Sequence, residues 1–343
     1  MFWLLPFLGC GFVSLVGSQE LPRYNSTLGS TALAAATFTN PLRQTNGADP
    51  FIITHQGYYY FMTTTYTDIK LTRSRTIEGL KTGETRTVYK DATKDRCCNV
   101  WSPQLAAIDG TWYIYFTSGQ ADNSQQRARV LKGGNHPWST YTYANRITDE
   151  WATDGTVTDI NRQHYYIFSC SRKPLLGKAQ QALCIAPFQT PTKLGAISVI
   201  SQPTAAWESA DGLMPVNAGP SVIYYGGRYI MAHSGTYCTS PSTAIGLMTL
   251  ENGMDPTRAA SWTKSGPVLG SAYDNYGPGH MTFFRSLDDK EVWSVYHATS
   301  NPRGACDKSR YTMAYIVEWD DKGNPLFRGP PPLNARNKVP SGE

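Results

Sequence analysis

The feature that most restricts the fold of this chain is a short hairpin pattern that recurs five times. In residues 46–62, small residues lead to Asp49, Pro50 begins an apolar run, Gln56-Gly57 turns the chain, and an aromatic run returns. Runs rich in aromatic and β-branched residues on either side of a short Gly-containing turn are typical of a β-hairpin. Similar stretches follow at residues 101–116, 154–168, 218–231 and 279–296.

The spacing of these stretches predicts the fold class. The hairpins recur roughly every 50 to 65 residues, close to or above the range that is typical of propeller blades and solenoids. Five four-stranded blades around a central axis would use the whole chain. We therefore predict an all-β, five-bladed β-propeller, with an ordinary all-β protein that contains several aromatic hairpins as the alternative.

The composition agrees with a single all-β domain. Of the 343 residues, 41% are hydrophobic, 12% aromatic and only 17% charged, so the chain can build a large core. No low-complexity linker divides it. We expect a leader at 19–39, a propeller at 40–328 and a flexible, Pro-rich tail at 329–343. The expected blades cover residues 40–90, 99–147, 152–202, 217–266 and the segment from 277 onward.

The N-terminal residues predict export. Residues 1–18 are apolar, end in small residues, and are too short and Gly-rich for a membrane span, which is typical of a secretory signal peptide. No later stretch is long and apolar enough to cross a bilayer, so we expect a secreted, extracellular protein with no membrane partner. Asn25 begins the only N-glycosylation acceptor, in the leader.

Six cysteines remain after Cys10 leaves with the signal peptide. An even number in an exported chain suggests disulfides, with fifteen possible pairings for six cysteines. No Cys-x-x-Cys or His-Glu-x-x-His pattern indicates zinc. The pairings that we favour are Cys170–Cys184 within the third blade, Cys238–Cys306 between blades four and five, and Cys97–Cys98, with two buried thiols as the alternative for the last pair.

The charge pattern argues against a nucleic-acid partner. The formal net charge of +5 is spread along the chain, whereas nucleic-acid binding needs a stripe of Lys and Arg with stacking aromatic residues. A mildly basic secreted protein is attracted only weakly to acidic cell-wall polymers.

The starts of the five blades are the candidate functional positions. The innermost strand of each propeller blade begins near the axis, so residues at those starts converge on one funnel. They are Asp49, Trp101, Asp154, Ala218 and His280. Two carboxylates, an aromatic ring and an imidazole suit a sugar site, because paired carboxyl groups hydrolyse glycosides. The alternative for both aspartates is a turn role before Pro or Gly.

Five motifs stand at these positions: Gly47-Ala48-Asp49-Pro50-Phe51, Asn99-Val100-Trp101-Ser102-Pro103, Asp154-Gly155-Thr156-Val157, Asn217-Ala218-Gly219-Pro220 and Gly277-Pro278-Gly279-His280. They resemble those of glycoside hydrolase family 43, in the family's order and across about residues 40–328. The resemblance implies a five-bladed propeller and an inverting mechanism, with α-L-arabinofuranosidase, arabinanase or β-xylosidase activity. The Arg303–Tyr311 segment resembles a fifth-blade loop of fungal members that act on arabinan.

The resemblance also implies a role for each matching residue. Asp49 would be the general base that activates water, and Asp154 the third carboxylate, which orients the acid and keeps its pKa raised. His280 would hold a water or a metal ion, such as a structural Ca²⁺ on the propeller axis, and no cofactor would be required. We expect His297 to pack within a strand. The implied substrate contacts are Phe51, Trp101 and Arg310, with a surface charge as the alternative for Arg310.

Ala218 is the main departure from the family pattern. The fourth motif of the family carries a glutamate between Asn and Gly-Pro, and that glutamate is the general acid. A methyl group cannot donate a proton, and general acid–base help is typically worth 10²- to 10⁴-fold in rate. Gln104, where the second motif often has Glu, removes a further charge expected near the rim. Glu208, upstream of Ala218, is a candidate substitute acid, with an ordinary surface glutamate as the alternative.

We therefore expect a secreted, monomeric, inverting glycoside hydrolase of the α-L-arabinofuranosidase type that acts on arabinan or arabinoxylan side chains and is impaired by Ala218. The chain is either a natural relative that has lost hydrolysis and kept sugar binding, or an Ala variant made to trap substrate. The alternatives are an inactive carbohydrate-binding protein, β-xylosidase or arabinanase specificity, and a purely structural propeller.

Overall fold

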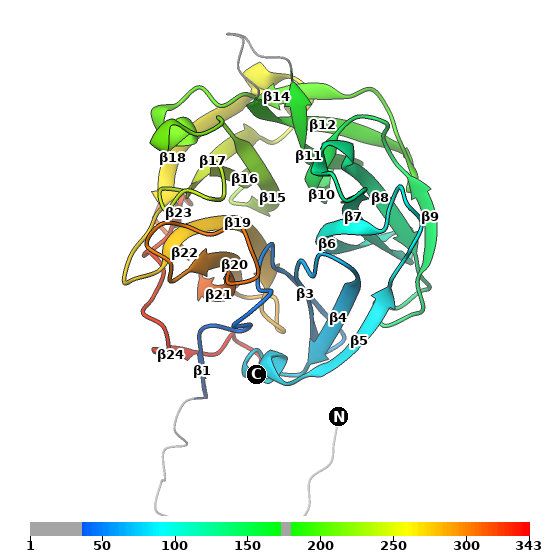
Figure 1. Ribbon diagram of the computed structural model, residues 1–343. Helices are drawn as coiled ribbons and strands as arrows, with labels where there is room; N and C mark the ends of the chain where they lie inside the picture. Colours follow the sequence, from blue (N-terminus) through cyan, green and yellow to red (C-terminus); the bar gives the residue numbers. More distant parts are fainter. Residues whose placement is uncertain (1–35, 173–179) are drawn as a thin grey trace, which may run out of the picture. The chain divides into compact units, whose positions relative to one another are not determined.

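The computed structural model describes residues 36–172 and 180–343. In this part of the chain the regular structure is almost entirely β-strand, and five sheets stand as blades around a central axis (Figure 1). The predicted five-bladed propeller is confirmed. The predicted signal peptide at 1–18 and the acceptor Asn25 lie outside the described residues. No helix among the described residues is long and apolar enough to span a membrane.

Each blade is an antiparallel sheet whose innermost strand comes first in the sequence. Blade one contains β2 (Phe51–His55), β3 (Tyr58–Met62), β4 (Ile69–Ser74) and β5 (Glu84–Tyr89). Blade two contains β6 (Cys98–Ile108), β7 (Thr111–Gly119), β8 (Arg127–Lys132) and β9 (Thr142–Arg146). Blade three contains β10 (Ala152–Ile160), β11 (Gln163–Arg172) and β12 (Gln180–Thr190), and both β13 (Lys193–Leu194) and β14 (Ser198–Ser201) pair with β12. Blade four contains β15 (Asn217–Tyr225), β16 (Arg228–Gly235), β17 (Ala244–Glu251) and β18 (Trp262–Leu269).

Blade five differs from the predicted four-stranded form. Its sheet contains only β19 (Tyr276–Arg285), β20 (Val292–Thr299) and β21 (Tyr311–Ile316). The chain then forms a separate short hairpin from β22 (Glu318–Trp319) and β23 (Pro325–Leu326). The Asp320 carboxylate accepts hydrogen bonds from the backbone N–H groups of Lys322 and Asn324, which closes a tight turn in place of a long outer strand. Four short 3₁₀ helices lie between strands: η1 (Glu78–Lys81), η2 (Asn123–Gln125), η3 (Ala206–Gly212) and η4 (Ala259–Ser261).

The C-terminal segment, for which the sequence predicted a flexible tail, contains a short strand. Within residues 329–343, β24 (Arg336–Lys338) pairs antiparallel with β1 (Thr37–Thr39), which lies in the predicted leader. A Glu343 oxygen accepts a hydrogen bond from the Ile77 backbone N–H. Phe38 is buried against Trp293 of blade five. The two ends of the described chain thus meet at the seam between the last and first blades, where Phe38 belongs to the hydrophobic cluster of that seam.

Five hydrophobic clusters fill the five seams between neighbouring blades. The aromatic strand β3 shows why the sequence builds them. Successive side chains of a strand point to opposite faces, so Tyr59 and Phe61 enter the seam with blade five, whereas Tyr60 and Met62 enter the seam with blade two. A strand buried on both faces needs an unbroken apolar run, and this run is the feature that makes the repeat visible in the sequence.

Candidate active site

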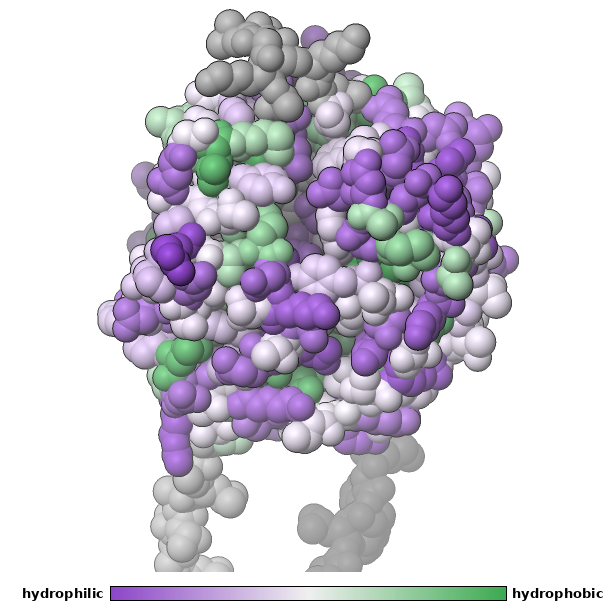
Figure 2. Space-filling view, viewed as in Figure 1, coloured by the Kyte–Doolittle hydropathy of each residue, from purple (hydrophilic) through white to green (hydrophobic). Residues whose placement is uncertain are grey.

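A pocket of about 150 Å³ opens at one end of the propeller axis, where the inner strands begin. Figure 2 shows the hollow near the centre of this face. All five blades contribute to its lining. The structure brings together every blade-start residue chosen from the sequence, since the lining includes Asp49, Trp101, Asp154, Ala218 and His280.

The same backbone conformation recurs at the start of each inner strand. Asp49, Ser102, Asp154, Gly219 and His280 have φ values of 52°, 50°, 55°, 58° and 49°, in the left-handed region that non-glycine residues rarely adopt. At blades two to five the strand pairing also shifts at this point. Such bulges bend a strand and redirect its side chains. Strain of this kind, repeated around one pocket, is expected where a site needs fixed side-chain directions.

This repeat refines the sequence alignment of the blades. Ser102 and Gly219, not Trp101 and Ala218, are structurally equivalent to the two aspartates and His280. Gly219 is also the only residue type that fits its position, because a Cβ atom there would lie 2.9 Å from Nδ1 of His280. In blade four the side chain that enters the pocket is therefore that of the preceding residue, Ala218.

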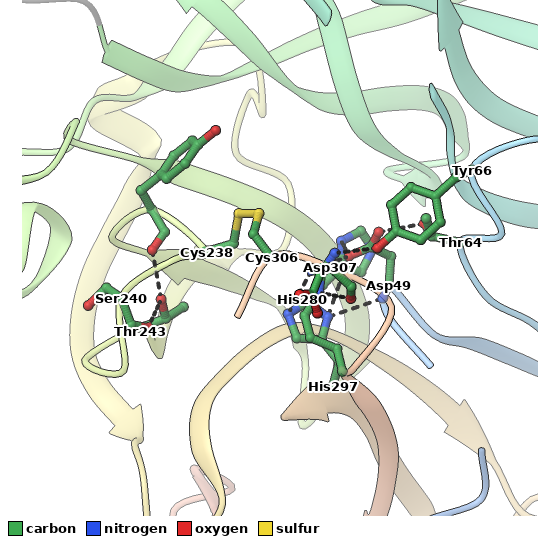
Figure 3. The surroundings of a disulfide bond; sticks show 12 residues. Asp49, Thr64, Tyr66, Cys238, Ser240, Thr243, His280, His297, Cys306 and Asp307 are labelled. Atoms are coloured by element: carbon green, nitrogen blue, oxygen red, sulfur yellow. Dashed lines mark hydrogen bonds and ion pairs between the residues drawn. A yellow bond between two sulfur atoms is a disulfide. The ribbon is translucent and has the colours of Figure 1, made fainter. Parts of the chain in front are cut away.

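Asp49 lies at the centre of a compact polar cluster (Figure 3). Its Oδ2 accepts a hydrogen bond of 2.5 Å from the Thr64 hydroxyl, and its backbone N–H donates to Nδ1 of His297 at 3.1 Å. Its Oδ1 lies 3.4 Å from Nδ1 of His297 and 3.6 Å from both Nδ1 of His280 and Nη1 of Arg310. The carboxylate is thus held from several directions and is only 8% exposed.

These contacts determine the protonation states in the cluster. Burial by itself would raise the pKa of Asp49, but Arg310, His280 and His297 and the hydrogen bond from Thr64 together lower it to about 2. Burial, followed by the charge of Arg310, lowers the pKa of His297 well below its ordinary value. At neutral pH the cluster therefore contains an ionised Asp49 beside a neutral His297 and a cationic Arg310.

Asp154 occupies a different environment. Its Oδ1 accepts hydrogen bonds from the hydroxyls of Ser102, at 2.6 Å, and Thr153, at 3.1 Å, and lies 3.9 Å from Nδ1 of His280. Burial raises the pKa of Asp154 and the neighbouring Asp49 carboxylate adds to the rise, while His280 opposes it. The two aspartates are therefore pushed in opposite directions, which is a common way to separate the roles of paired carboxyl groups.

Two residues expected at the site lie elsewhere. Phe51 packs against the cluster between blades one and two and lines a separate hollow, not this pocket. Gln104 also lines that second hollow, so it does not lie near the rim. The reason is the direction of the inner strands, which run away from the pocket, so that residues two positions after a left-handed start already lie below its floor.

The comparison with known sequences now identifies the family. Residues 38–325 match the sequence model of "Glycosyl hydrolases family 43". The chain belongs to this family. The "Extracellular exo-alpha-(1->5)-L-arabinofuranosidase" of Streptomyces avermitilis is 34% identical over 327 residues, which cover 88% of this chain and 66% of that protein. "Alpha-L-arabinofuranosidase 43" of Humicola insolens is 33% identical over 329 residues, or 90% of this chain and 67% of that protein.

A solved structure resembles the fold closely. The α-L-arabinofuranosidase from Lactobacillus brevis superposes with a TM-score of 0.79 at 28% sequence identity, over 87% of this chain and 98% of that one. The family 43 chain described here spans about two thirds of the length of the two curated relatives named above.

In this family 43 chain Glu208 has a structural role. Its side chain is fully buried but does not line the pocket. Oε1 accepts hydrogen bonds of 2.8 Å from the Asn217 amide and the Lys264 ammonium group, and Oε2 accepts from the backbone N–H groups of Thr204 and Ala205. All the acceptor positions of the carboxylate are thus engaged by fixed donors. The candidate substitute acid is therefore wrong, and so is its surface alternative.

The axial position of His280 offers one ring nitrogen to a small polar group. Nε2 of His280 is buried and has no hydrogen-bond partner among the described residues, so it can bind one small polar group. The described residues contain no group of three or more His, Cys, Asp and Glu side chains placed to hold a metal ion. Ca²⁺ takes six to eight oxygen ligands, which include waters, so an ion at this position would take most of its ligands from water.

A disulfide fixes one wall of the pocket (Figure 3). Cys238, after β16, is bonded to Cys306, in the loop between β20 and β21, and both residues line the pocket. The second loop leads to Arg310, whose Nη2 lies 3.4 Å from the Tyr66 hydroxyl. The other two pairs in the structure are Cys170–Cys184 and Cys97–Cys98.

Sequence reasoning missed several residues of this site. His297 was expected only to pack in a strand, yet it lines the pocket and accepts a hydrogen bond from the Asp49 backbone. Thr64 and Tyr66 follow β3, and Trp151 precedes β10. None stands in a blade-start motif, so the only signal was their place at strand ends on the pocket side.

Proposed function

We propose that this chain is a secreted protein of the α-L-arabinofuranosidase type whose pocket binds a terminal α-L-arabinofuranosyl group of arabinan or arabinoxylan, and whose hydrolysis is impaired. Two observations support the assignment of an arabinofuranosyl ligand. The first is the activity named for the family 43 relatives. The second is a pocket that combines ionised Asp49 and Arg310 with the rings of Trp101 and Trp151. Sugar sites commonly combine hydrogen-bonding polar groups with a few flat apolar surfaces.

Asp49 is the proposed general base. In an inverting mechanism one carboxylate takes a proton from the water that attacks the anomeric carbon, and a second carboxyl group protonates the leaving oxygen. With its pKa at about 2, Asp49 is ionised at every ordinary working pH. The Thr64 hydroxyl occupies Oδ2, so Oδ1, which faces His280 and Arg310 across more than 3 Å, is the atom that would accept the proton.

Ala218 carries the proposal of impaired hydrolysis. Asp49 and Asp154 are the only carboxylic acids among the described residues that line the pocket, and Ala218 contributes a methyl group. Asp154 has a raised pKa, but its proposed role is to orient an acid at position 218 and to tune the pKa of that acid. This chain has alanine at position 218, so Asp154 has no acid to act on. A leaving group that is stable as an anion can still depart, whereas a sugar hydroxyl departs poorly without protonation.

The same observation favours a second candidate function, that of a carbohydrate-binding protein without turnover. Binding depends on the pocket walls and on Arg310, and removing a proton donor leaves these unchanged. The two functions differ in one measurable property, which is slow release of arabinose from an activated substrate.

The test compares binding with turnover. Calorimetric titration with α-1,5-linked arabino-oligosaccharides should show binding that is stronger than to xylo-oligosaccharides and is reduced by Arg310→Ala and by Trp101→Ala. Incubation with an aryl α-L-arabinofuranoside should release the aryl group slowly, while arabinan stays intact. Equal affinity for both sugars would contradict the assignment to arabinose. Rapid cleavage of arabinan would contradict the proposed impairment of hydrolysis. Absence of any sugar binding would favour a structural propeller.

A further inference from the structure

Three arginines and two aromatic rings form a row at the seam between blades one and two, far from the pocket. Tyr58 begins β3 just after the turn where β2 ends, at the opposite end of that strand from Asp49. Arg73 lies in β4, Arg75 follows it, and Arg86 lies in β5. Trp138 comes from the segment that joins β8 to β9 in blade two.

The members of this row alternate between cation and ring. The Arg75 guanidinium carbon lies 4.5 Å from the centre of the Tyr58 ring, and that of Arg73 lies 5.3 Å from the same ring. Arg73 and Arg86 each lie 4.3 Å from the centre of the Trp138 ring. Stacking on rings in this way fixes the planes of the guanidinium groups. Of the three arginines, Arg75 alone has no hydrogen bond to another described residue.

The positive charge of the row is only partly neutralised. Glu84 accepts from Nε and Nη2 of Arg73 at 2.9 and 2.7 Å. Neither Arg75 nor Arg86 has a carboxylate partner among the described residues. Nη2 of Arg86 donates to the Ser139 carbonyl oxygen, and Nε of Arg86 is buried without a partner. Arg75 is exposed. Residues 69–146, which include most of the row, carry twelve Lys and Arg against six Asp and Glu, so this part of the chain holds a charge that exceeds the net +5 of the whole.

We propose that this row, Arg75–Tyr58–Arg73–Trp138–Arg86, is a second binding site, for the carboxylate groups of an acidic polysaccharide. The planar guanidinium fork of exposed Arg75 matches a carboxylate, and the positive charges of Arg73 and Arg86 beside it favour a polymer that carries repeated carboxylates over a single small anion. A nucleic acid is disfavoured, because single strands are bound through free aromatic faces, whereas guanidinium groups lie over both rings here.

The position of the row defines what this site would do. It lies at the far end of the blade from the pocket, so a bound acidic polymer leaves the pocket open. The site would therefore hold the protein on an acidic matrix while the pocket engages a neutral side chain. The proposal does not depend on the function proposed for the pocket, because it requires neither sugar binding nor turnover there.

The experiment measures binding of the intact protein to polygalacturonate, with neutral linear arabinan as the second polymer, by affinity electrophoresis and calorimetry at 20 and 200 mM NaCl. We expect polygalacturonate affinity to fall roughly ten-fold or more at the higher salt, because ions compete with charge–charge contacts. Arg75→Glu alone, and Arg73→Gln combined with Arg75→Gln, should each reduce affinity at 20 mM NaCl at least ten-fold and leave arabinan binding unchanged.

Lys193→Gln combined with Arg336→Gln is the matched control, because both residues are exposed and the change in net charge equals that of the double variant of the row. An equal loss in this control would show that only net charge matters and would overturn the site. So would the absence of polygalacturonate binding by the unaltered protein. Equal competition by duplex DNA would overturn the assignment to a carboxylated polysaccharide. Arg75→Glu keeps the test valid if the Arg73 variant does not fold.

Discussion

Replacing Ala218 with glutamate should place a proton donor in the pocket. Ala218 is the second residue of the inner strand β15 and lines the pocket, as His280 and Asp154 do. Its neighbour Gly219 closely approaches His280, but Ala218 is partly exposed to the pocket and a longer side chain can extend into that space. The buried Asp154 carboxyl group would raise the pKa of the new glutamate by like-charge repulsion, which is the property that a general acid needs.

The size of the effect depends on the leaving group. General acid catalysis contributes typically 10²- to 10⁴-fold, which corresponds to about 2.7–5.5 kcal/mol of activation free energy. We expect Ala218→Glu to raise kcat/KM by this factor on arabinan, whose leaving hydroxyl needs a proton. On an aryl arabinofuranoside the gain should be roughly ten-fold or less, because a phenolate departs without protonation.

The assay compares three proteins on both substrates: the unaltered chain, Ala218→Glu and Ala218→Gln. Glutamine has nearly the same shape as glutamate but donates no acidic proton, so the Gln variant separates proton transfer from pocket filling. Arabinose release is followed over a pH series, and the gain of the Glu variant should disappear as the pH rises above the pKa of the new carboxyl group.

Two results would refute this reasoning. If Ala218→Glu is as inactive on arabinan as the Gln variant, while both still bind the oligosaccharide, position 218 is not the place of the acid. If the Glu variant gains equally on the aryl substrate and on arabinan, the new side chain acts on binding or on water and not on the leaving group.

Three further predictions concern the groups around the pocket. Asp49→Asn should abolish the remaining aryl turnover with little change in oligosaccharide affinity, and unchanged kcat would remove Asp49 from the mechanism. Because the folded-state pKa of Asp49 is about 2, below the ordinary 3.8, its ionisation stabilises the fold above that value. The contribution of Asp49 to the free energy of unfolding, about 2 kcal/mol, should then be lost as the pH falls from about 4 to 2. Urea denaturation should show this loss for the unaltered chain and not for Asp49→Asn. Lys264→Met should destabilise the fold by about 3–5 kcal/mol, because it leaves Glu208 charged and buried without its cation, and adding Glu208→Gln should recover part of this loss.

The fold was predictable because the inner hairpins are buried on both faces. A strand such as β3 serves two seams at once, and this requirement produces the unbroken aromatic run that marks each repeat. The outer parts of the blades carry a weaker pattern. Two features were not predictable: the three-stranded fifth blade and the pairing of β1 with β24. Both depend on side-chain contacts, such as those of Asp320 and Phe38, that leave no periodic pattern in the sequence.

The site was predictable only as far as the motifs reach. Motifs at blade starts located the residues on the inner strands, since the propeller geometry brings those starts together. His297 lies near the end of β20, Thr64 follows β3, and Trp151 precedes β10. Whether such residues reach the pocket depends on the path of the loops, which the motifs do not show. Phe51 was predicted to contact the sugar but lies below the pocket. The motif that contains it does not show which of its residues face the pocket.

Different blades supply the separate parts of the proposed reaction, and for this reason we expect sugar binding to persist without turnover. Asp49 is held by Thr64 of its own blade and by His297 and Arg310 of blade five. The acid position belongs to blade four, where Asn217 is fixed from beneath by Glu208. No contact that holds Asp49 passes through Ala218. Loss of a carboxyl group at position 218 therefore leaves the base and the sugar-facing walls in place, and Ala218→Glu should change kcat far more than oligosaccharide affinity.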